Sequence, residues 1–403
     1  MSNVSITVSE TRDFLKPKKV YIPLASTKSK YYDLFVYEGD EVAVGEKIAE
    51  RFGDLRTPIF SSVSGKVVGI ESMEFHSGIH VDHLVIENDM KETLCEDVKP
   101  LEGEETARNI QRKIEELGIR GLDQTGMYTR FDFTKRIDHV VINAVFQNEP
   151  FAKVGYDFFK GNTKEIVEGV KLLGKAAFTD VTVIVPKGED YSVFTNEGIN
   201  VHAVNTKKPA WHYTALTKIV GRELPFDLAS AAVMFVSIAS AKAVYDAVKT
   251  GMPVVSRRVT VMGDALASNA TYEVKIGTNI SDLMNDLGRP EDIDEVSVYS
   301  GSIMNGRTMA SCNFAISEHI SSIGIQIPRD IENHVCTKCG RCNDACPVGI
   351  LPQNIMDSEL RMIDERIYEL DVNKCIECGR CSYVCPSEIN VLEWVRRAKR
   401  RIK

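Results

Sequence analysis

Long apolar runs are absent from this sequence of 403 residues. A helix that crosses a membrane needs about 20 consecutive apolar residues. The longest candidate, residues 229–244, is shorter, rich in small residues and interrupted by Lys242. The N-terminal stretch has neither the apolar core nor the cleavage pattern of a secretory signal. We therefore expect a cytoplasmic protein, peripheral on the inner face of the membrane only if its partners hold it there.

A surplus of basic residues is also absent. The chain carries 57 acidic and 49 basic side chains, which gives a net charge of −8, whereas proteins that bind nucleic acids rely on surplus Lys and Arg. The sequence therefore argues against a nucleic-acid partner. Apolar residues make up 43% and charged residues 26%, ordinary proportions that exclude a disordered or fibrous chain. The length favours several domains rather than one.

Cysteine is scarce outside one segment of the chain. Of the ten cysteines, only Cys95 and Cys312 lie outside residues 336–385. Clustering at fixed spacing is typical of a metal site rather than of a disulfide framework. We interpret the two outlying cysteines as inert small hydrophobic residues rather than redox centres, with Cys312 the better candidate of the two because it precedes the cluster segment.

The clustered cysteines form two complete repeats of one pattern. In each repeat, three cysteines are separated by two residues each, and a fourth lies immediately before Pro347 or Pro386. In two-cluster ferredoxins, this fourth cysteine binds the other [4Fe–4S] cluster. The pattern therefore predicts two [4Fe–4S] clusters. The first is assigned to Cys336, Cys339, Cys342 and Cys385, and the second to Cys375, Cys378, Cys381 and Cys346.

A pair of zinc sites is the alternative, because Cys-x-x-Cys pairs also build zinc ribbons. A zinc ion needs only four ligands, so a zinc site does not explain why each repeat has a third cysteine at the same spacing and then a Cys-Pro pair. Apolar residues recur at helical spacing at Leu360, Ile363, Ile367 and Leu370, and again at Ile389, Leu392, Val395 and Ala398. We therefore expect residues 326–403 to form a helical two-cluster ferredoxin-like domain. Its basic tail, residues 396–403, is either a solvated helix end or a docking patch for an acidic partner.

The N-terminal part of the chain is rich in short β runs. Residues 18–72 alternate between such runs and turns that contain glycine. The stretch resembles the barrel-sandwich fold of biotinyl and lipoyl carrier domains, and we assign residues 1–100 to this domain. The carriers place a modifiable lysine at a hairpin tip, whereas the matching residues 61–65 include no lysine. We therefore expect a structural module rather than a swinging-arm carrier.

The middle of the chain divides into two further modules. Residues 101–250 alternate between apolar runs and helical patterns, which predicts a Rossmann-like α/β domain with mostly parallel strands. Residues 251–325 predict a β-grasp module of the SLBB-like type, with strands over 258–262 and 272–276 and a helix over 280–287. Gly288 is the expected end of that helix.

This order of modules resembles the C subunit of the Rnf electron-transport complex over nearly the whole chain. The likeness is strongest in SSVSGKVVGI, AVYDAVKTGMPVVSRRVTVMGDAL, CGRCNDACPVGILPQ and KCIECGRCSYVCPSEI. Members of this family, and the related flavin subunit of respiratory complex I, bind FMN and NADH in the α/β domain through a loop reading roughly GLGGAGFPT. The resemblance implies an electron-transfer component of an oxidoreductase system rather than an enzyme that acts alone.

The matching loop of this chain departs from the family pattern. It keeps Gly121 and Gly126, but Asp123 and Gln124 replace two glycines. Consecutive glycines let backbone N–H groups approach phosphates, whereas a carboxylate at that place repels them. Two other elements of the family's site have also changed, in residues 143–150 and 208–213. We therefore expect the FMN/NADH site to be lost or repurposed.

The leading hypothesis is an electron-transfer protein that relays electrons between redox partners through two [4Fe–4S] clusters. The resemblance implies that these partners are Rnf-type membrane subunits or a reductase such as proline reductase, as in a relative found in amino-acid-fermenting anaerobes. One alternative is an FMN-containing, NADH-oxidising subunit of a membrane electron-transport complex. The other is a non-redox scaffold whose clusters only brace its C-terminal domain.

Overall fold

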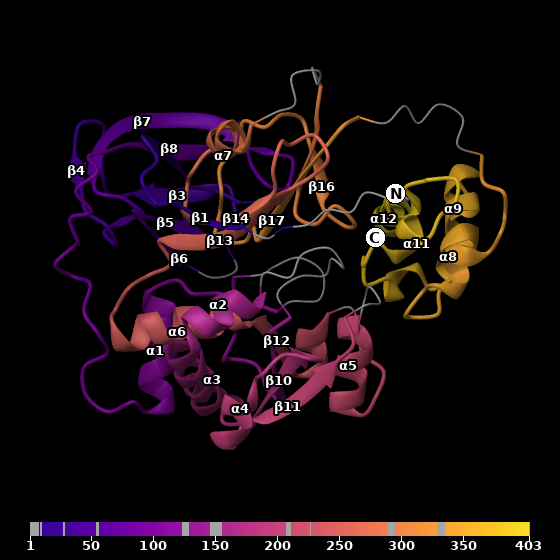
Figure 1. Cartoon of the computed structure of the whole chain (residues 1–403), viewed down its shortest axis with the longest axis horizontal. Coiled ribbons are helices and arrows are strands. Elements are labelled where there is room, and N and C mark those ends of the chain that lie inside the picture. The colour runs from indigo at the N-terminus through magenta and orange to yellow at the C-terminus, as the bar shows by residue number, and fades with distance from the viewer. Residues whose placement is uncertain are drawn as a thin grey trace.

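The structure is a computed structural model that describes residues 8, 10–26, 29–53, 56–122, 129–145, 155–206, 211–225, 227–288, 295–328 and 335–402. Two β-rich modules lie side by side above an α/β module, and a small helical module lies to one side of them (Figure 1). Within the described residues, no helix is both long enough and apolar enough to cross a membrane.

Two small antiparallel sheets form the N-terminal module. Their strand orders are β2-β8-β7-β4 and β3-β5-β6. Val20, Ile48 and Ile86 are completely buried between them, because alternate residues of each strand face the same core. The strands are β2 Lys19–Pro23, β3 Tyr31–Leu34, β4 Glu41–Val42, β5 Lys47–Phe52, β6 Thr57–Phe60, β7 Gly65–Glu74 and β8 His80–Asn88.

The stretch that matches the carriers' modifiable tip is buried. Ser61 and Ser62 have no exposed surface, and Ser62 Oγ donates a 2.6 Å hydrogen bond to the carbonyl oxygen of Ile276 in the third module. A side chain on Gly65 would overlap the backbone carbonyl of Glu87, so only glycine fits where β7 meets β8. The tip is a contact between modules, which leaves no room for a swinging arm.

The largest sheet has the order β1-β14-β13-β17-β15-β16 and includes the first strand of the chain. β1 pairs in parallel with β14, with Glu10 opposite Ala270. Residues 10–14, which the sequence pattern assigned to the N-terminal domain, therefore belong to the sheet of the third module. The strands are β1 Glu10–Phe14, β13 Ser256–Met262, β14 Ala270–Lys275, β15 Ser297–Ser300, β16 Arg307–Met309 and β17 Ser322–Gln326.

Helix α7, Ile280–Leu287, covers this sheet with its buried residues Leu283 and Leu287. Its N-terminus is capped by Asn279, whose side chain accepts a hydrogen bond from the backbone of Ser281. Gly288 follows it with a φ of +72°, a conformation that favours glycine. The predicted bounds of this helix are confirmed.

The α/β module contains a sheet of the order β11-β10-β9-β12 in which all neighbouring strands are parallel. Successive residues of β9 face different cores: Val140 and Ile142 pack with α1, α3 and α6, whereas Val141 packs with α5 and η1. Helices thus cover both faces, as the alternation of elements predicted. The elements are α1 Ala107–Glu116, β9 His139–Asn143, α2 Gly155–Gly161, α3 Thr163–Ala177, β10 Val181–Pro186, α4 Ser192–Asn196, β11 Asn200–Val204, α5 Trp211–Val220, η1 Leu228–Ala231, β12 Val233–Ser237 and α6 Ile238–Lys249.

The C-terminal module is helical, as predicted. Ile355, Ile367 and Val395 form the centre of its core. The predicted apolar face over residues 389–398 is buried. The elements are α8 Arg341–Asp344, α9 Pro352–Leu360, α10 Asp364–Glu369, η2 Val372–Lys374, α11 Arg380–Tyr383 and α12 Val391–Arg401.

The predicted single helical face over residues 360–370 is wrong. The chain turns between α9 and α10, where Met362 has a φ of +59°. Leu360 and Ile363 are consequently 54% and 40% exposed, whereas Ile367 is buried. The turn allows α9 and α10 to pack separately on α12, so the regularly spaced apolar residues do not form one continuous helix.

Candidate metal centre

Two short turns of the C-terminal module present most of the clustered cysteines. Gly340 precedes α8 and Gly379 precedes α11, each with a φ of +76°. Such a left-handed residue lets the loop that carries the first two cysteines of a repeat fold back over the helix that carries the third. The two repeats therefore place their Cys-x-x-Cys-x-x-Cys segments in the same local conformation.

The structure brings together one cysteine group across the two repeats. Cys336, Cys339, Cys342 and Cys385 all line one pocket, with Gln353 and Met356 of α9 on its wall. A hydrogen bond from the backbone of Arg341 lowers the pKa of Cys339, whose side chain is exposed. Burial raises the pKa of Cys342. This set, the exposed cysteine group, opens to the surface at Cys339.

The other cysteines form a second group that lies deeper. Burial raises the pKa of Cys375 to about 12 and that of Cys378 to about 11, and it raises the pKa of Cys381 well above its ordinary value. Cys346 of the first repeat lies close enough to influence Cys378 and Cys381 electrostatically. These four residues, the buried cysteine group, have the composition predicted for the second cluster.

The shape of the exposed cysteine group favours a multi-atom cluster over a single ion. A zinc ion needs its sulfur ligands at about 2.3 Å. Among the described residues, no three His, Cys, Asp or Glu side chains gather closely enough to hold one metal ion. The four cysteines instead surround an open volume, and thiolates around such a volume are the ligands of iron–sulfur clusters. The donor set therefore fits a [4Fe–4S] cluster.

The buried cysteine group packs against the α/β module. Ile376, between Cys375 and Cys378, is 2% exposed and joins the core formed by α5, η1 and one face of the parallel sheet. Cys378 and Val348 contact the same core. The exposed cysteine group has no such cover among the described residues: Lys338, which corresponds to Glu377 in the second repeat, is exposed.

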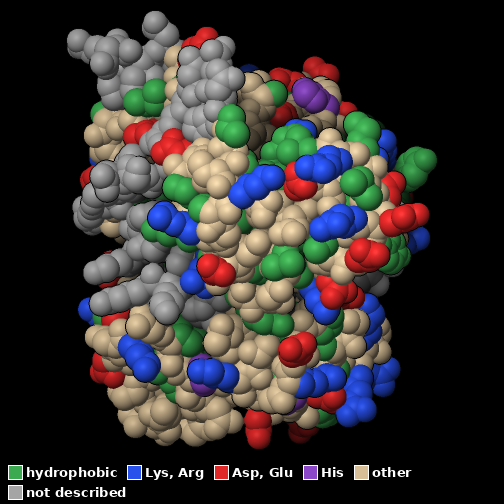
Figure 2. Space-filling view, turned by 90° about the vertical axis from the view of Figure 1, so that its right-hand side faces the viewer, with side chains coloured by type: hydrophobic (Ala, Val, Ile, Leu, Met, Phe, Trp, Pro, Cys, Tyr) green, Lys and Arg blue, Asp and Glu red, His purple; other side chains and the backbone are tan. Residues whose placement is uncertain are grey.

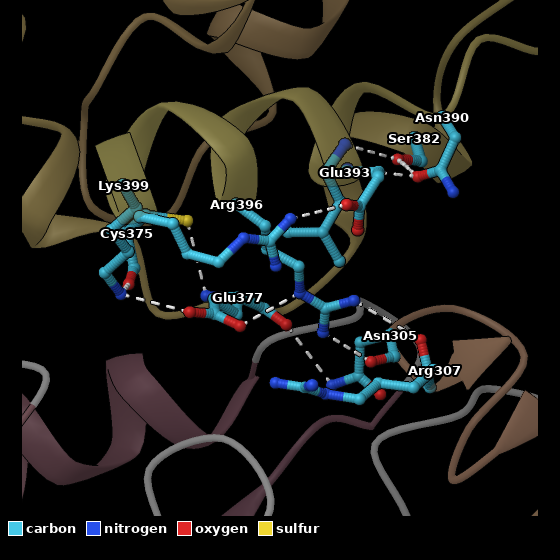
Figure 3. A network of polar contacts seen from close by, with 12 residues as sticks. Asn305, Arg307, Cys375, Glu377, Ser382, Asn390, Glu393, Arg396 and Lys399 are labelled. Carbon is cyan, nitrogen blue, oxygen red and sulfur yellow. Dashed lines mark hydrogen bonds and ion pairs between the residues drawn. The ribbon is translucent and has the colours of Figure 1, made fainter. Parts of the chain in front are cut away.

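Glu377 is the centre of an ionic network beside the buried cysteine group (Figure 3). Its carboxylate lies 2.9 Å from Nε of Arg396 and 3.2 Å from Nζ of Lys399, both on α12. Burial raises the pKa of Glu377, but the charges of Lys399 and Arg396 outweigh it and hold the pKa below its ordinary value. Its backbone N–H donates to Sγ of Cys375 at 3.4 Å, a contact of the kind that stabilises cluster sulfurs.

The same network joins the helical module to the third module. Nη2 of Arg396 donates to the carbonyl oxygen of Asn305 at 2.6 Å, and Nη1 donates to that of Gly306 at 3.3 Å. Asn305 Nδ2 in turn donates to the carbonyl oxygen of Glu377 at 3.3 Å. The turn between β15 and β16 therefore contacts the loop of the buried cysteine group, as Figure 3 shows. This contact was not predicted from the sequence; the one signal for it is the carboxylate of Glu377 between Cys375 and Cys378, which needs a cationic partner.

The basic C-terminal helix carries partners for its charges. Besides Arg396 and Lys399, the described cations of α12 pair with acids of the same module: Arg397 and Arg400 with Glu393, and Arg401 with Glu359 and Asp364. On the face of the molecule that carries this module, Lys and Arg side chains are interspersed with Asp and Glu (Figure 2). The positive charge that the sequence concentrates is thus distributed among local ion pairs.

Most of the predicted flavin loop lies outside the described residues. Asp123, Gln124 and Gly126 belong to that gap; of the loop over residues 121–129, Gly121, Leu122 and Thr129 are described, with a φ of +88° at Gly121. In another changed element of the family's site, His212 on α5 is buried, and burial lowers its pKa to about 4. The loss of the flavin site therefore stays a prediction.

The outlying cysteines lie away from both groups. Cys312 packs beside the core of the third module, where Ser281 Oγ lies 3.7 Å from its sulfur. Cys95 is partly buried, and its backbone N–H donates to the carbonyl oxygen of Val44. Both residues occupy ordinary structural positions in the fold.

Comparison with known proteins matches both ends of the chain to families. Residues 5–91 match the RnfC barrel sandwich hybrid domain, and residues 335–389 match the 4Fe-4S dicluster domain. The barrel-sandwich fold of the first module and the ferredoxin fold of the last are thereby confirmed.

Three curated relatives, each the C subunit of its complex, align with most of the chain. It is 27% identical to that of the Na(+)-translocating ferredoxin:NAD(+) oxidoreductase complex of Acetobacterium woodii, over 86% of this chain and 82% of that protein. It is 27% identical to the C subunit of the proton-translocating ferredoxin:NAD(+) oxidoreductase complex of Clostridium ljungdahlii, over 83% of this chain and 77% of that protein. It is 27% identical to the C subunit of the ion-translocating oxidoreductase complex of Serratia proteamaculans, over 84% of this chain. The match spans about half, 51%, of that protein.

One solved structure is also similar. It is a crystal structure of NAD+-reducing [NiFe]-hydrogenase in the H2-reduced state, with a TM-score of 0.47 and 13% identity, which covers 76% of this chain and 65% of that one.

Proposed function

Because the chain belongs to the RnfC-like family, we propose that it is an electron-transfer protein that relays electrons between redox partners. The observation that carries the proposal is the pair of four-cysteine groups, each assembled across the two repeats. In this proposal, Cys336, Cys339, Cys342 and Cys385 hold one [4Fe–4S] cluster, and Cys375, Cys378, Cys381 and Cys346 hold the other. Each cluster would supply one-electron redox chemistry.

The chain's own residues give the two cysteine groups different tasks. The exposed group opens to the surface at Cys339, so a partner protein can approach it closely. The buried group is partly covered by Ile376 and by the turn at Asn305, and Cys375 is its buried member. We assign exchange with an external partner to the exposed group and electron exchange with the cluster of the exposed group, as the second step of the relay, to the buried group.

In this proposal the FMN/NADH site of the family is absent from the α/β module. The support is chemical: Asp123 and Gln124 stand where the family has glycines, and a carboxylate repels the phosphate that the loop would otherwise bind. Electrons then reach the chain from a partner protein. Rnf-type membrane subunits and a reductase such as proline reductase are the two candidate partners, and the genes that neighbour this one distinguish them.

Cofactor analysis of anaerobically purified protein tests the proposal. We expect about eight iron atoms per chain, consistent with two four-iron clusters, and clusters that dithionite reduces to EPR-active states. Acid precipitation should release no FMN. About one FMN per chain would instead establish the alternative of a flavin-dependent NADH-oxidising subunit. Clusters that neither dithionite nor a physiological donor reduces would establish the scaffold alternative.

A further inference from the structure

A hollow lies where the first three modules meet, and none of the cysteines lines it. β6 and the end of α1 approach each other at its wall: a side chain on Gly118 would come within 2.9 Å of the carbonyl oxygen of Pro58. The hollow holds about 130 Å³ of free space and is partly open to solvent. Ligand-binding sites occur preferentially as concave spaces at the junctions between domains. We call this space the inter-module hollow.

Positive charge dominates the inter-module hollow. Arg51, Arg120 and Arg130 line it, and Glu318 is the single carboxylate among the described lining residues. Burial lowers the pKa of Arg51 and that of Arg120. The charge of Glu318 opposes this at Arg51, and the charges of Glu115 and Asp132 oppose it at Arg120. Repulsion from Arg130 adds to it at both. Arg130 therefore lies close enough to Arg51 and to Arg120 to repel both, and Glu318 is the one carboxylate among the described residues that line the hollow.

The two histidines of the hollow do not add to this positive charge. Burial lowers the pKa of His76 to about 3, and it lowers the pKa of His319 as well. Both rings are therefore neutral near pH 7. They lie in a T-shaped arrangement with centroids 5.9 Å apart, and His76 bonds with Ser317 at 3.1 Å.

Two of the guanidinium groups are held in place by backbone carbonyls. Arg51 donates to the carbonyl oxygens of Leu24 and Pro23, at 3.2 and 2.9 Å. Arg120 donates from Nη2 to the carbonyl oxygen of Arg56 at 3.1 Å. Its Nε is buried, and the described residues offer it no hydrogen-bond acceptor. A buried donor without an acceptor is costly, and an oxygen of a bound anion would satisfy it.

The rest of the lining is apolar. Ile22, Phe60, Leu117 and Ile276 form walls beside the arginines. An apolar wall beside a few fixed cations is typical of sites for organic molecules that carry one anionic group. We propose that the inter-module hollow binds a small organic anion, whose phosphate or carboxylate contacts Arg120 and Arg51 and whose apolar body rests on these walls. Gly121 and Leu122, the described start of the predicted flavin loop, also line the hollow, and the proposal does not depend on the cysteine groups of the proposed electron relay.

Isothermal titration calorimetry of the full chain with its clusters, under anaerobic conditions, tests the proposal. The probes are phenyl phosphate, benzoate and the neutral analogue benzyl alcohol. We expect at least one of the two anions to bind once per chain, and benzyl alcohol to bind roughly tenfold more weakly or less. The tighter anion identifies the recognised group. Absence of binding by both anions, or equal binding of benzyl alcohol, overturns the proposal.

Two variants with opposite expected effects separate anion binding from damage to the fold. Arg120→Met should weaken binding of the tighter anion roughly tenfold. Glu318→Gln removes the carboxylate of the hollow and should strengthen binding several-fold, a result that a disrupted structure does not produce. Arg108→Met, at an exposed position of α1, is the matched control and should leave binding unchanged. Unchanged affinity in both Arg120→Met and Glu318→Gln overturns the proposal.

Discussion

Lys399 donates a hydrogen bond from Nζ to the carbonyl oxygen of Cys375 at 2.9 Å. The lysine is only 8% exposed, and its charge also lies 3.2 Å from the carboxylate of Glu377. A cation is thus fixed against the loop of the buried cysteine group, whereas at the exposed group Lys338 extends into solvent. Because a fixed charge in a poorly solvated place acts strongly on its neighbours, the two groups have different electrostatic surroundings.

We predict that Lys399→Met lowers the reduction potential of one cluster and leaves the other unchanged. Loss of a nearby positive charge disfavours the reduced, more negative state. The expected decrease is on the order of 60 mV, equivalent to a tenfold change in a one-electron equilibrium. A potentiometric titration followed by EPR measures it. Arg397→Met on the same helix, where Arg397 is half exposed and paired with Glu393, is the control; an equal shift in that variant contradicts the prediction.

We predict that the cysteines act in groups that cross the two repeats. Cys346→Ala should alter the same cluster as Cys378→Ala, although Cys346 lies in the first repeat. Cys385→Ala should likewise alter the same cluster as Cys339→Ala. Low-temperature EPR and iron content of the four purified variants identify the affected cluster. If Cys346→Ala instead resembles Cys339→Ala, each repeat holds its own cluster and the proposed assignment fails.

The two glycines that precede α8 and α11 provide a matched pair of substitutions. Gly340 and Gly379 share a φ of +76°, so alanine adds the same backbone strain at both, about 1–2 kcal/mol. A side chain at position 340 meets open space, whereas one at position 379 overlaps the carbonyl oxygen of Met304. We therefore predict a larger loss of stability for Gly379→Ala than for Gly340→Ala.

Amide hydrogen exchange distinguishes the two glycine variants. In Gly379→Ala, exchange should accelerate in residues 302–306, the turn that contacts the buried cysteine group. In Gly340→Ala, exchange of this turn should match that of the unchanged protein. Equal acceleration in both variants would mean that the turn does not depend on the contact with Gly379.

His212 should make the α/β module sensitive to acid. Burial lowers its pKa to about 4 in the folded protein, whereas an unfolded histidine titrates near 6.5. Between these values the unfolded state binds more protons, so stability falls as the pH decreases. The loss from pH 6.5 to pH 5 is about 2 kcal/mol, at roughly 1.4 kcal/mol per pH unit.

Hydrogen exchange across α5 at pH 7 and pH 5 measures this effect. His212→Leu should show a smaller difference between the two pH values than the unchanged protein, after correction for intrinsic exchange rates. His80→Gln, at an exposed position of β8, should retain the full difference. Identical pH dependence in His212→Leu and the unchanged protein would assign the acid sensitivity to other groups.

The sequence alone predicted those features that depend only on residues close together in the chain. The spacing of the cysteines predicts two cysteine groups, because short loops with left-handed glycines leave few ways to arrange the three closely spaced thiols of each repeat. The end of helix α7 was predictable from Gly288, since a helix end depends on hydrogen bonds within a few residues. The apolar face of α12 was likewise predictable from its period.

Only the tertiary structure decided which distant segments meet. β1 joins β14 across most of the chain, and backbone pairing of this kind leaves no local signature. The turn at Met362 divides an apolar pattern that could have formed one helix, because packing on α12 favours two. Arg396 bonds to carbonyl groups of Asn305 and Gly306, and three arginines meet in the inter-module hollow. Such contacts depend on how whole modules pack. The lack of long apolar runs and of surplus positive charge argued against a membrane-spanning helix and a nucleic-acid partner, but it could not show where these charged side chains lie.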